Sequence, residues 1–96
     1  MIKHVVFFKL KDNSAESINK AKEVLLSMNG NVPMIKNLEI GIDFLKSERS
    51  YDICLQVEVE DKEQLTAYAN DPYHCNVVKE YIFERILSSA VVDYEL

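Results

Sequence analysis

The first segment of the chain, residues 2–10, predicts a β-strand because its side chains alternate between two faces. One face would carry His4, Val6, Phe8 and Leu10, and the other would carry Val5 and Phe7. Both faces are largely apolar, which is typical of a central strand that is covered on both sides. We therefore expect this strand in the middle of a sheet.

Helical spacing replaces this alternation in the next segment. Asn13 is a candidate N-cap, with Glu16 at the reciprocal position of a capping box. Beyond it, apolar residues recur at intervals of three and four along one face of the predicted helix: Ile18, Ala21, Leu25 and Met28. Residues 29–31 (Asn-Gly-Asn) end the helix, and Pro33 prevents its immediate resumption.

Two further alternating segments predict a β-hairpin with a polar turn at residues 46–49. The apolar positions of its first strand are Leu38, Ile40, Ile42 and Phe44. Those of its second strand are Tyr51, Ile53, Leu55, Val57 and Val59.

Helix signals follow the hairpin. Asp61 can cap a short helix that stops near Asn70. Asp71 can cap a new helix with Pro72 in its first turn, and this helix is expected to continue to about Leu87. Residues 90–94 predict a closing strand.

The resulting order, β-α-β-β-α-β, predicts an α+β protein with the ferredoxin-like arrangement. Such a fold has a four-stranded antiparallel sheet with helices on one face. We find no linker or internal repeat, so residues 1–96 are interpreted as one domain. An apolar open face would expose a large patch, which a second subunit could cover by sheet-to-sheet packing. We therefore expect a homodimer.

Composition narrows the possible partners. The formal net charge is −5, and the Lys and Arg residues are scattered, which argues against nucleic acid and anionic membrane surfaces as partners. No apolar run approaches the ~20 residues of a membrane helix. Cys54 and Cys75 lack metal-type spacing, and a cytoplasmic location with reduced thiols is expected. Neither a metal nor another cofactor is indicated by any motif.

The candidate chemistry lies around the Asp71-Pro72 break. His74 would be the third residue of the new helix, where the positive end of the helix dipole favours a neutral imidazole. A neutral imidazole near the Tyr68 phenol is a plausible acid/base pair. The alternatives are a packed helix-start residue for His74 and core packing for Tyr68. His4 could line the same pocket or be a half-buried strand residue.

Four segments of the chain together resemble the Dabb domain family, the stress-responsive α/β-barrel proteins. They are residues 4–11 (HVVFFKLK), 50–55 (SYDICL), 67–74 (AYANDPYH) and 91–94 (VVDY). The resemblance implies a ferredoxin-like subunit that pairs into a dimeric α/β barrel, with a pocket between sheet and helices in each subunit. Most members of the family have no assigned reaction, and some plant members are polyketide cyclases with a catalytic Tyr/His pair.

The same resemblance maps the family's tyrosine onto Tyr68, its last histidine onto His74 and its first-strand histidine onto His4. This chain departs from the family's "H-P-x-H" pattern, because Asp71 replaces the first histidine and changes the local charge.

Two function classes therefore remain open. One is a dimeric protein that binds a small apolar ligand without catalysis. The other is a cofactor-free enzyme of the polyketide cyclase or small monooxygenase type, which requires Tyr68, His74 and His4 to converge on one cavity.

Overall fold

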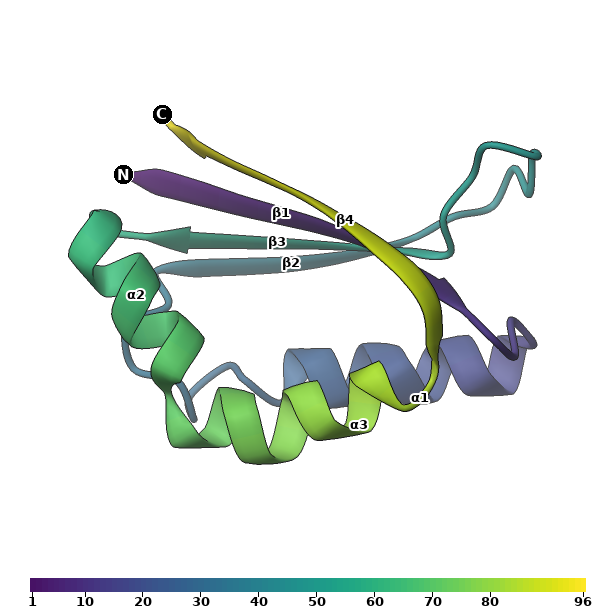
Figure 1. Cartoon of the computed structure of the whole chain (residues 1–96), viewed down its shortest axis with the longest axis horizontal. Coiled ribbons are helices and arrows are strands. Elements are labelled where there is room, and N and C mark those ends of the chain that lie inside the picture. Colours follow the sequence, from purple (N-terminus) through teal and green to yellow (C-terminus); the bar gives the residue numbers. More distant parts are fainter.

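The chain folds into one four-stranded antiparallel sheet with helices on one side (Figure 1). A computed structural model describes residues 1–96. The strands are β1 (Ile2–Leu10), β2 (Asn37–Ile42), β3 (Ile53–Val59) and β4 (Ile86–Glu95). The helices are α1 (Ala15–Leu26), α2 (Lys62–Asn70), the π-helix η1 (His74–Lys79) and α3 (Glu80–Phe83). The predicted α+β, ferredoxin-like fold is confirmed.

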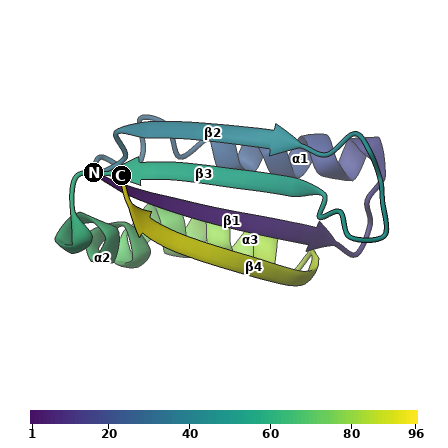
Figure 2. The same ribbon diagram turned by 90° about the horizontal axis from the view of Figure 1, so that it is seen from above.

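The central position of β1 is also confirmed, since the strand order is β2-β3-β1-β4. In Figure 2 the helices lie behind the sheet, with α1 near β2, α3 near β1 and β4, and α2 at one end. The opposite face of the sheet has no covering layer in the single chain. There Phe7 of β1 and Val92 of β4 remain 36% and 56% exposed. No helix is both long enough and apolar enough to cross a membrane.

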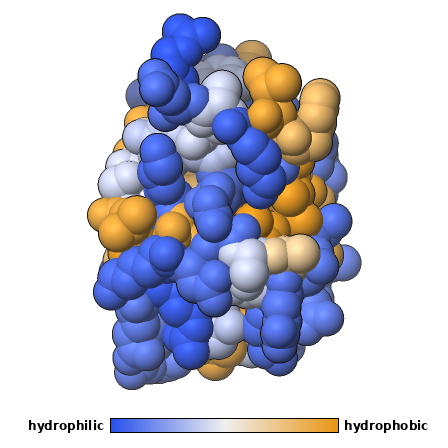
Figure 3. Space-filling view, turned by 90° about the vertical axis from the view of Figure 1, so that its right-hand side faces the viewer, coloured by the Kyte–Doolittle hydropathy of each residue, from blue (hydrophilic) through white to orange (hydrophobic).

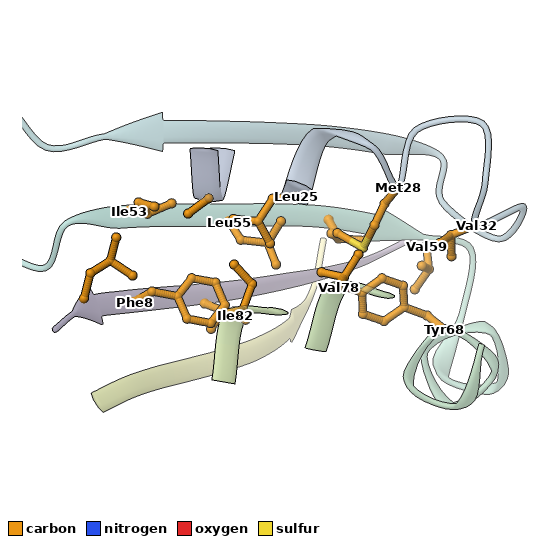
Figure 4. Packing of buried hydrophobic residues seen from close by; sticks show 14 of the residues in the cluster. Phe8, Leu25, Met28, Val32, Ile53, Leu55, Val59, Tyr68, Val78 and Ile82 are labelled. Atoms are coloured by element: carbon orange, nitrogen blue, oxygen red, sulfur yellow. The ribbon is translucent and has the colours of Figure 1, made fainter. Parts of the chain in front are cut away.

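The hydrophobic core fills the space between the sheet and the helices (Figure 4). Alternate residues of β1 and β3 supply its sheet side, because the antiparallel register pairs Val6 with Leu55 and Phe8 with Ile53. The predicted stripe of the first helix is buried against them, and Met28 is buried although α1 ends at Leu26.

The N-cap of α1 is Ser14 rather than the predicted Asn13. The Ser14 side chain accepts a hydrogen bond from the Ser17 backbone N–H, and the Asp12 carboxylate accepts one from the Ser14 N–H. A serine hydroxyl can accept a hydrogen bond from the third helical N–H as well as an asparagine side chain can, so the cap moves one residue along the chain. The predicted Asp61 cap of α2 is confirmed, because its carboxylate accepts from the Gln64 N–H.

The hairpin is shorter than predicted at its turn. Its last register pair is Ile42 with Ile53, so Phe44 lies in the connection and is 90% exposed. The Asp43 side chain accepts a hydrogen bond from the Lys46 N–H, and Lys46 has a positive φ of 59°. This local turn bends the chain away before Phe44 can pair.

The end of the chain departs most from prediction. The last helix ends at Phe83 rather than near Leu87, and β4 begins at Ile86 rather than at Ala90. Pairing of β4 along nearly all of β1 extends the strand, which shows tertiary contacts overriding helical spacing. The π-helix that begins at His74 was not predicted from the sequence either.

Candidate functional site

The chain bends sharply at Asp71, between α2 and η1, and this bend positions His74 (Figure 1). Asp71 ends α2, and its carboxylate accepts a hydrogen bond at 3.1 Å from the His74 backbone N–H. Its own carbonyl accepts from the Cys75 N–H at 2.9 Å. The predicted helix start at Asp71-Pro72 is thus confirmed, with His74 in the first turn.

The side chains of His4, Tyr68 and His74 lie together although they come from β1, α2 and η1. The ring centroids of Tyr68 and His74 are 4.4 Å apart, with the planes inclined by 35°. The centroids of His4 and Tyr68 are 5.5 Å apart in an edge-to-face arrangement. Tyr68 thus stands between the two imidazoles.

These three residues line a cavity of about 250 Å³ that is otherwise mainly apolar. Its deep walls come from the core, and its rim comes from partly or fully exposed residues of β4 and the last helix. Figure 4 shows Tyr68 pointing from α2 into the core toward Val78, a residue of the deep wall. The full lining is His4, Val6, Phe8, Leu25, Leu55, Tyr68, His74, Val78, Lys79, Ile82, Phe83, Ser89 and Val91.

The same three side chains also face a second, outer hollow, which lies beside α2 and reaches Asp93. They therefore form the partition between the apolar cavity and the surface. A larger hollow of about 560 Å³ lies elsewhere, around Phe7 and Tyr51 at the β2–β3 connection. It contains none of the candidate residues, so we assign the site to the smaller cavity.

The pKa of the His74 imidazole lies below its ordinary value of 6.5. Burial is the largest cause, because it penalises the charged form. The Ala69 carbonyl and the Asp71 carboxylate act in the opposite direction, whereas the nearby charges of Lys79 and His4 lower the pKa further. The direction agrees with the sequence prediction, although burial rather than the helix dipole dominates. The buried His74 Nδ1 has no hydrogen-bond partner.

Burial raises the pKa of the Tyr68 phenol, and the Asp93 carboxylate raises it further. Only 1% of Tyr68 is exposed, and its hydroxyl contacts Met28 Sδ at 3.8 Å. The phenol therefore stays protonated at neutral pH and can act as a hydrogen-bond donor. Thioether sulfur is a weak acceptor, so this contact leaves the donor available to a better partner.

Asp93 is the site residue that sequence reasoning missed. It is paired with His4 across β1 and β4, and its Oδ1 is hydrogen-bonded to His4 Nδ1. This bond fixes the ring and leaves Nε2 as the free nitrogen. The available signal was an acidic residue at an alternate position of the apolar closing strand, but its partner depended on the strand register.

The remaining polar residues do not form a metal centre. No group of three or more His, Cys, Asp or Glu side chains is arranged to hold a metal ion. Cys75 follows His74 in sequence, but its Sγ donates to the Ala69 carbonyl at 3.1 Å. The site is therefore a partly enclosed apolar cavity in a ferredoxin-like subunit, with two imidazoles and a phenol at one end.

The whole chain matches one protein family. Residues 2–96 match the family Dabb, described as "Stress responsive A/B Barrel Domain", and the chain belongs to this family. The resemblance seen in the sequence is thus confirmed. No curated protein matches the chain at a significant level.

Solved structures share the fold over nearly the full length. A dimeric protein of unknown function with a ferredoxin-like fold from Bacteroides fragilis NCTC 9343 is 29% identical, with a TM-score of 0.84 over 99% of this chain and 95% of that one. A protein from Arabidopsis thaliana is 21% identical, with a TM-score of 0.86 over 100% and 95%. A hydroxynitrile lyase from Passiflora edulis is 16% identical, with a TM-score of 0.83 over 99% and 92%.

Proposed function

We propose that this protein is a homodimer in which each subunit binds a small, largely apolar molecule in the cavity beside His4, Tyr68 and His74. The observation that carries the proposal is the unpartnered His74 Nδ1 at the end of a mainly apolar cavity. A buried ring nitrogen without a hydrogen-bond partner is costly, and a hydrogen-bonding group of a ligand would satisfy it. Two free thiols, Cys54 and Cys75, fit the cytoplasmic location that is part of the proposal.

The size of the cavity limits the ligand. A cavity of roughly 150 Å³ can take benzene, so about 250 Å³ suits a molecule somewhat larger than a single ring. The apolar body would contact Phe8, Leu55 and Ile82, which are almost completely buried. One polar group would reach the Tyr68 hydroxyl and the His74 ring.

The homodimer rests on the uncovered face of the sheet. Phe7 and Val92 are exposed there, and Phe44 and Leu45 in the adjoining β2–β3 connection are 90% and 71% exposed. The end of the molecule that carries this connection is mainly hydrophilic, but hydrophobic atoms gather in its upper right part (Figure 3). A second copy of the sheet would cover such a patch. The similar protein from Bacteroides fragilis is dimeric.

Sedimentation at micromolar concentration tests the dimer. We expect about twice the chain mass of 11.1 kDa. Phe7→Glu should shift the protein toward the monomer, because it places a charge in the proposed interface. Val77→Glu is the control, since Val77 is 44% exposed on the helix side. A parent protein that sediments only as a monomer contradicts the barrel arrangement.

The alternative function is a cofactor-free enzyme of the polyketide cyclase or small monooxygenase type that uses the Tyr68/His74 pair. A lowered His74 pKa keeps the imidazole neutral near pH 7, as a general base requires. Tyr68 would polarise a substrate oxygen through its hydroxyl, while His74 removes a proton. One protein of this fold is a hydroxynitrile lyase, so the fold is compatible with catalysis.

Substitutions of His74 and Tyr68 test whether these residues bind a ligand, act in catalysis or only pack in the core. His74→Ala and Tyr68→Phe should weaken the binding of 4-ethylphenol, followed by NMR shifts of cavity residues, while folding is nearly unchanged. For any turnover that is found, an acid/base role predicts a loss on the order of 10²–10⁴-fold in His74→Ala. Asn76→Ala, an exposed change on the same helix, is the matched control. A lower melting temperature with unaltered binding would instead assign His74 a packing role.

A further inference from the structure

Lys79 supplies the only permanently charged group among the residues that line the cavity. Its Nζ lies 5.3 Å from the ring centroid of Phe83, at the rim, where Phe83 is 54% exposed. The chain contains 16 Asp and Glu residues against 11 Lys and Arg residues, yet Lys79 takes part in no ion pair. A partly buried lysine without a counter-ion therefore lines the mouth of an apolar cavity.

The π-helix explains why Lys79 reaches this position. In an α-helix, residues five apart are rotated by about 140°, so His74 and Lys79 would face different directions. A π-helix forms i→i+5 hydrogen bonds, which bring residues five apart close to the same side. The π-helix spans His74–Lys79, and both of its end residues line the cavity. The π-helix thus places a lysine and an imidazole along the same wall of the cavity.

We propose that the ligand of this cavity is a small apolar carboxylate, with the Lys79 ammonium as its counter-ion at the rim. This inference rests on the proposed ligand-binding function and names the chemical class of the ligand. The carboxylate stays at the rim between Lys79 and Ser89, whereas the apolar body and the polar group that reaches Tyr68 and His74 lie inside. One ammonium suits a single negative charge, whereas phosphate recognition in proteins uses several donors or a helix N-terminus.

A matched pair of probes tests the role of the charge: 4-ethylbenzoate and its neutral amide, 4-ethylbenzamide. We expect the parent protein to bind the benzoate more tightly, and Lys79→Gln to reduce benzoate affinity by about three- to tenfold with amide affinity unchanged. Lys20→Gln is the control: it changes the net charge by the same amount, but Lys20 lies exposed on α1, so both affinities should stay unchanged. Added salt should weaken the binding of the benzoate more than the binding of the amide.

The pKa of His74, followed by NMR, gives an independent readout. The bound benzoate should neutralise the field of Lys79 and raise this pKa in the parent protein, whereas the amide should not raise it. In Lys79→Gln the rise should be smaller. The titratable groups that also influence this pKa are His4 and Asp71, and Asp93 lines the outer hollow beside the ring; none of these residues changes in this comparison.

The outcomes distinguish the two proposals. Equal affinity for both probes, unchanged in Lys79→Gln, overturns the carboxylate assignment and leaves the apolar pocket in place. If neither probe binds or shifts the His74 resonances, both the proposed pocket function and the carboxylate assignment are refuted.

Discussion

The substitution Phe8→Ala measures how much the central strand contributes to stability. Phe8 of β1 is 6% exposed and points into the core beside Ile82 of the last helix (Figure 4). A phenylalanine in such a position buries about 150–250 Å², and each Å² of apolar area is worth about 25 cal/mol. After the area that alanine retains is subtracted, the expected loss is about 3–5 kcal/mol. Because Phe8 also lines the cavity, its removal enlarges an existing space that the neighbouring side chains do not fill.

Urea denaturation at one fixed protein concentration is the appropriate assay, because association stabilises the folded chain by mass action. Phe83→Ala is the control, because it removes the same ring from a site that is 54% exposed. It should lower the free energy of unfolding by no more than about 1.5 kcal/mol. If Phe8→Ala does not fold, Phe8→Leu should give a smaller loss in the same direction. A loss below about 1 kcal/mol, or one no larger than that of Phe83→Ala, refutes the burial of Phe8.

Three further predictions concern the site itself. Because the folded His74 pKa lies below 6.5, the unfolded chain binds the proton first as the pH falls. The contribution of His74 to the free energy of unfolding should therefore be fully present above pH 6.5 and be lost as the pH drops below it. His74→Gln should flatten this pH dependence in denaturation curves taken between pH 7 and pH 5. Tyr68→Phe should change the free energy of unfolding by less than about 1 kcal/mol, because the hydroxyl contacts only Met28 Sδ, and a larger loss would reveal a stronger partner. Asp93→Asn should change the tautomer of His4 in ¹⁵N NMR spectra while the sheet remains folded, and an unchanged tautomer would show that the bond to Nδ1 does not fix it.

The sheet and its core could be predicted from the sequence because they depend on local alternation. Residues 2–10 alternate so regularly that both bounds of β1 were predicted correctly, together with its central place. The stripe from Ile18 to Met28 likewise identified the buried side of α1. In these segments the hydrophobic pattern and the tertiary contacts favour the same structure.

Predictions failed where a distant partner decides the local structure. Residues 84–87 follow helical spacing, yet Ile86 pairs with Leu10 and becomes part of β4. Asp93 meets His4 only because of this register, so its place in the site could not be read from neighbouring residues. The π-helix is a further case. Its hydrogen bonds span five residues instead of the four of an α-helix, and the side chains in this segment did not reveal that difference.

The electrostatics of the cavity couple ligand binding to the basicity of His74. In the free protein, burial and the charge of Lys79 both lower the His74 pKa, so the ring is neutral near pH 7 and its buried Nδ1 has no hydrogen-bond partner. A neutral ligand deepens the burial and makes the ring a weaker base. An anionic ligand at Lys79 buries the ring as well but offsets one of the charges that lower its pKa, so the ring is expected to be a stronger base than beside the neutral ligand. His74 is therefore expected to accept a proton more readily beside an anionic ligand than beside its neutral counterpart, because the ligand carboxylate offsets the field of the lysine that binds it.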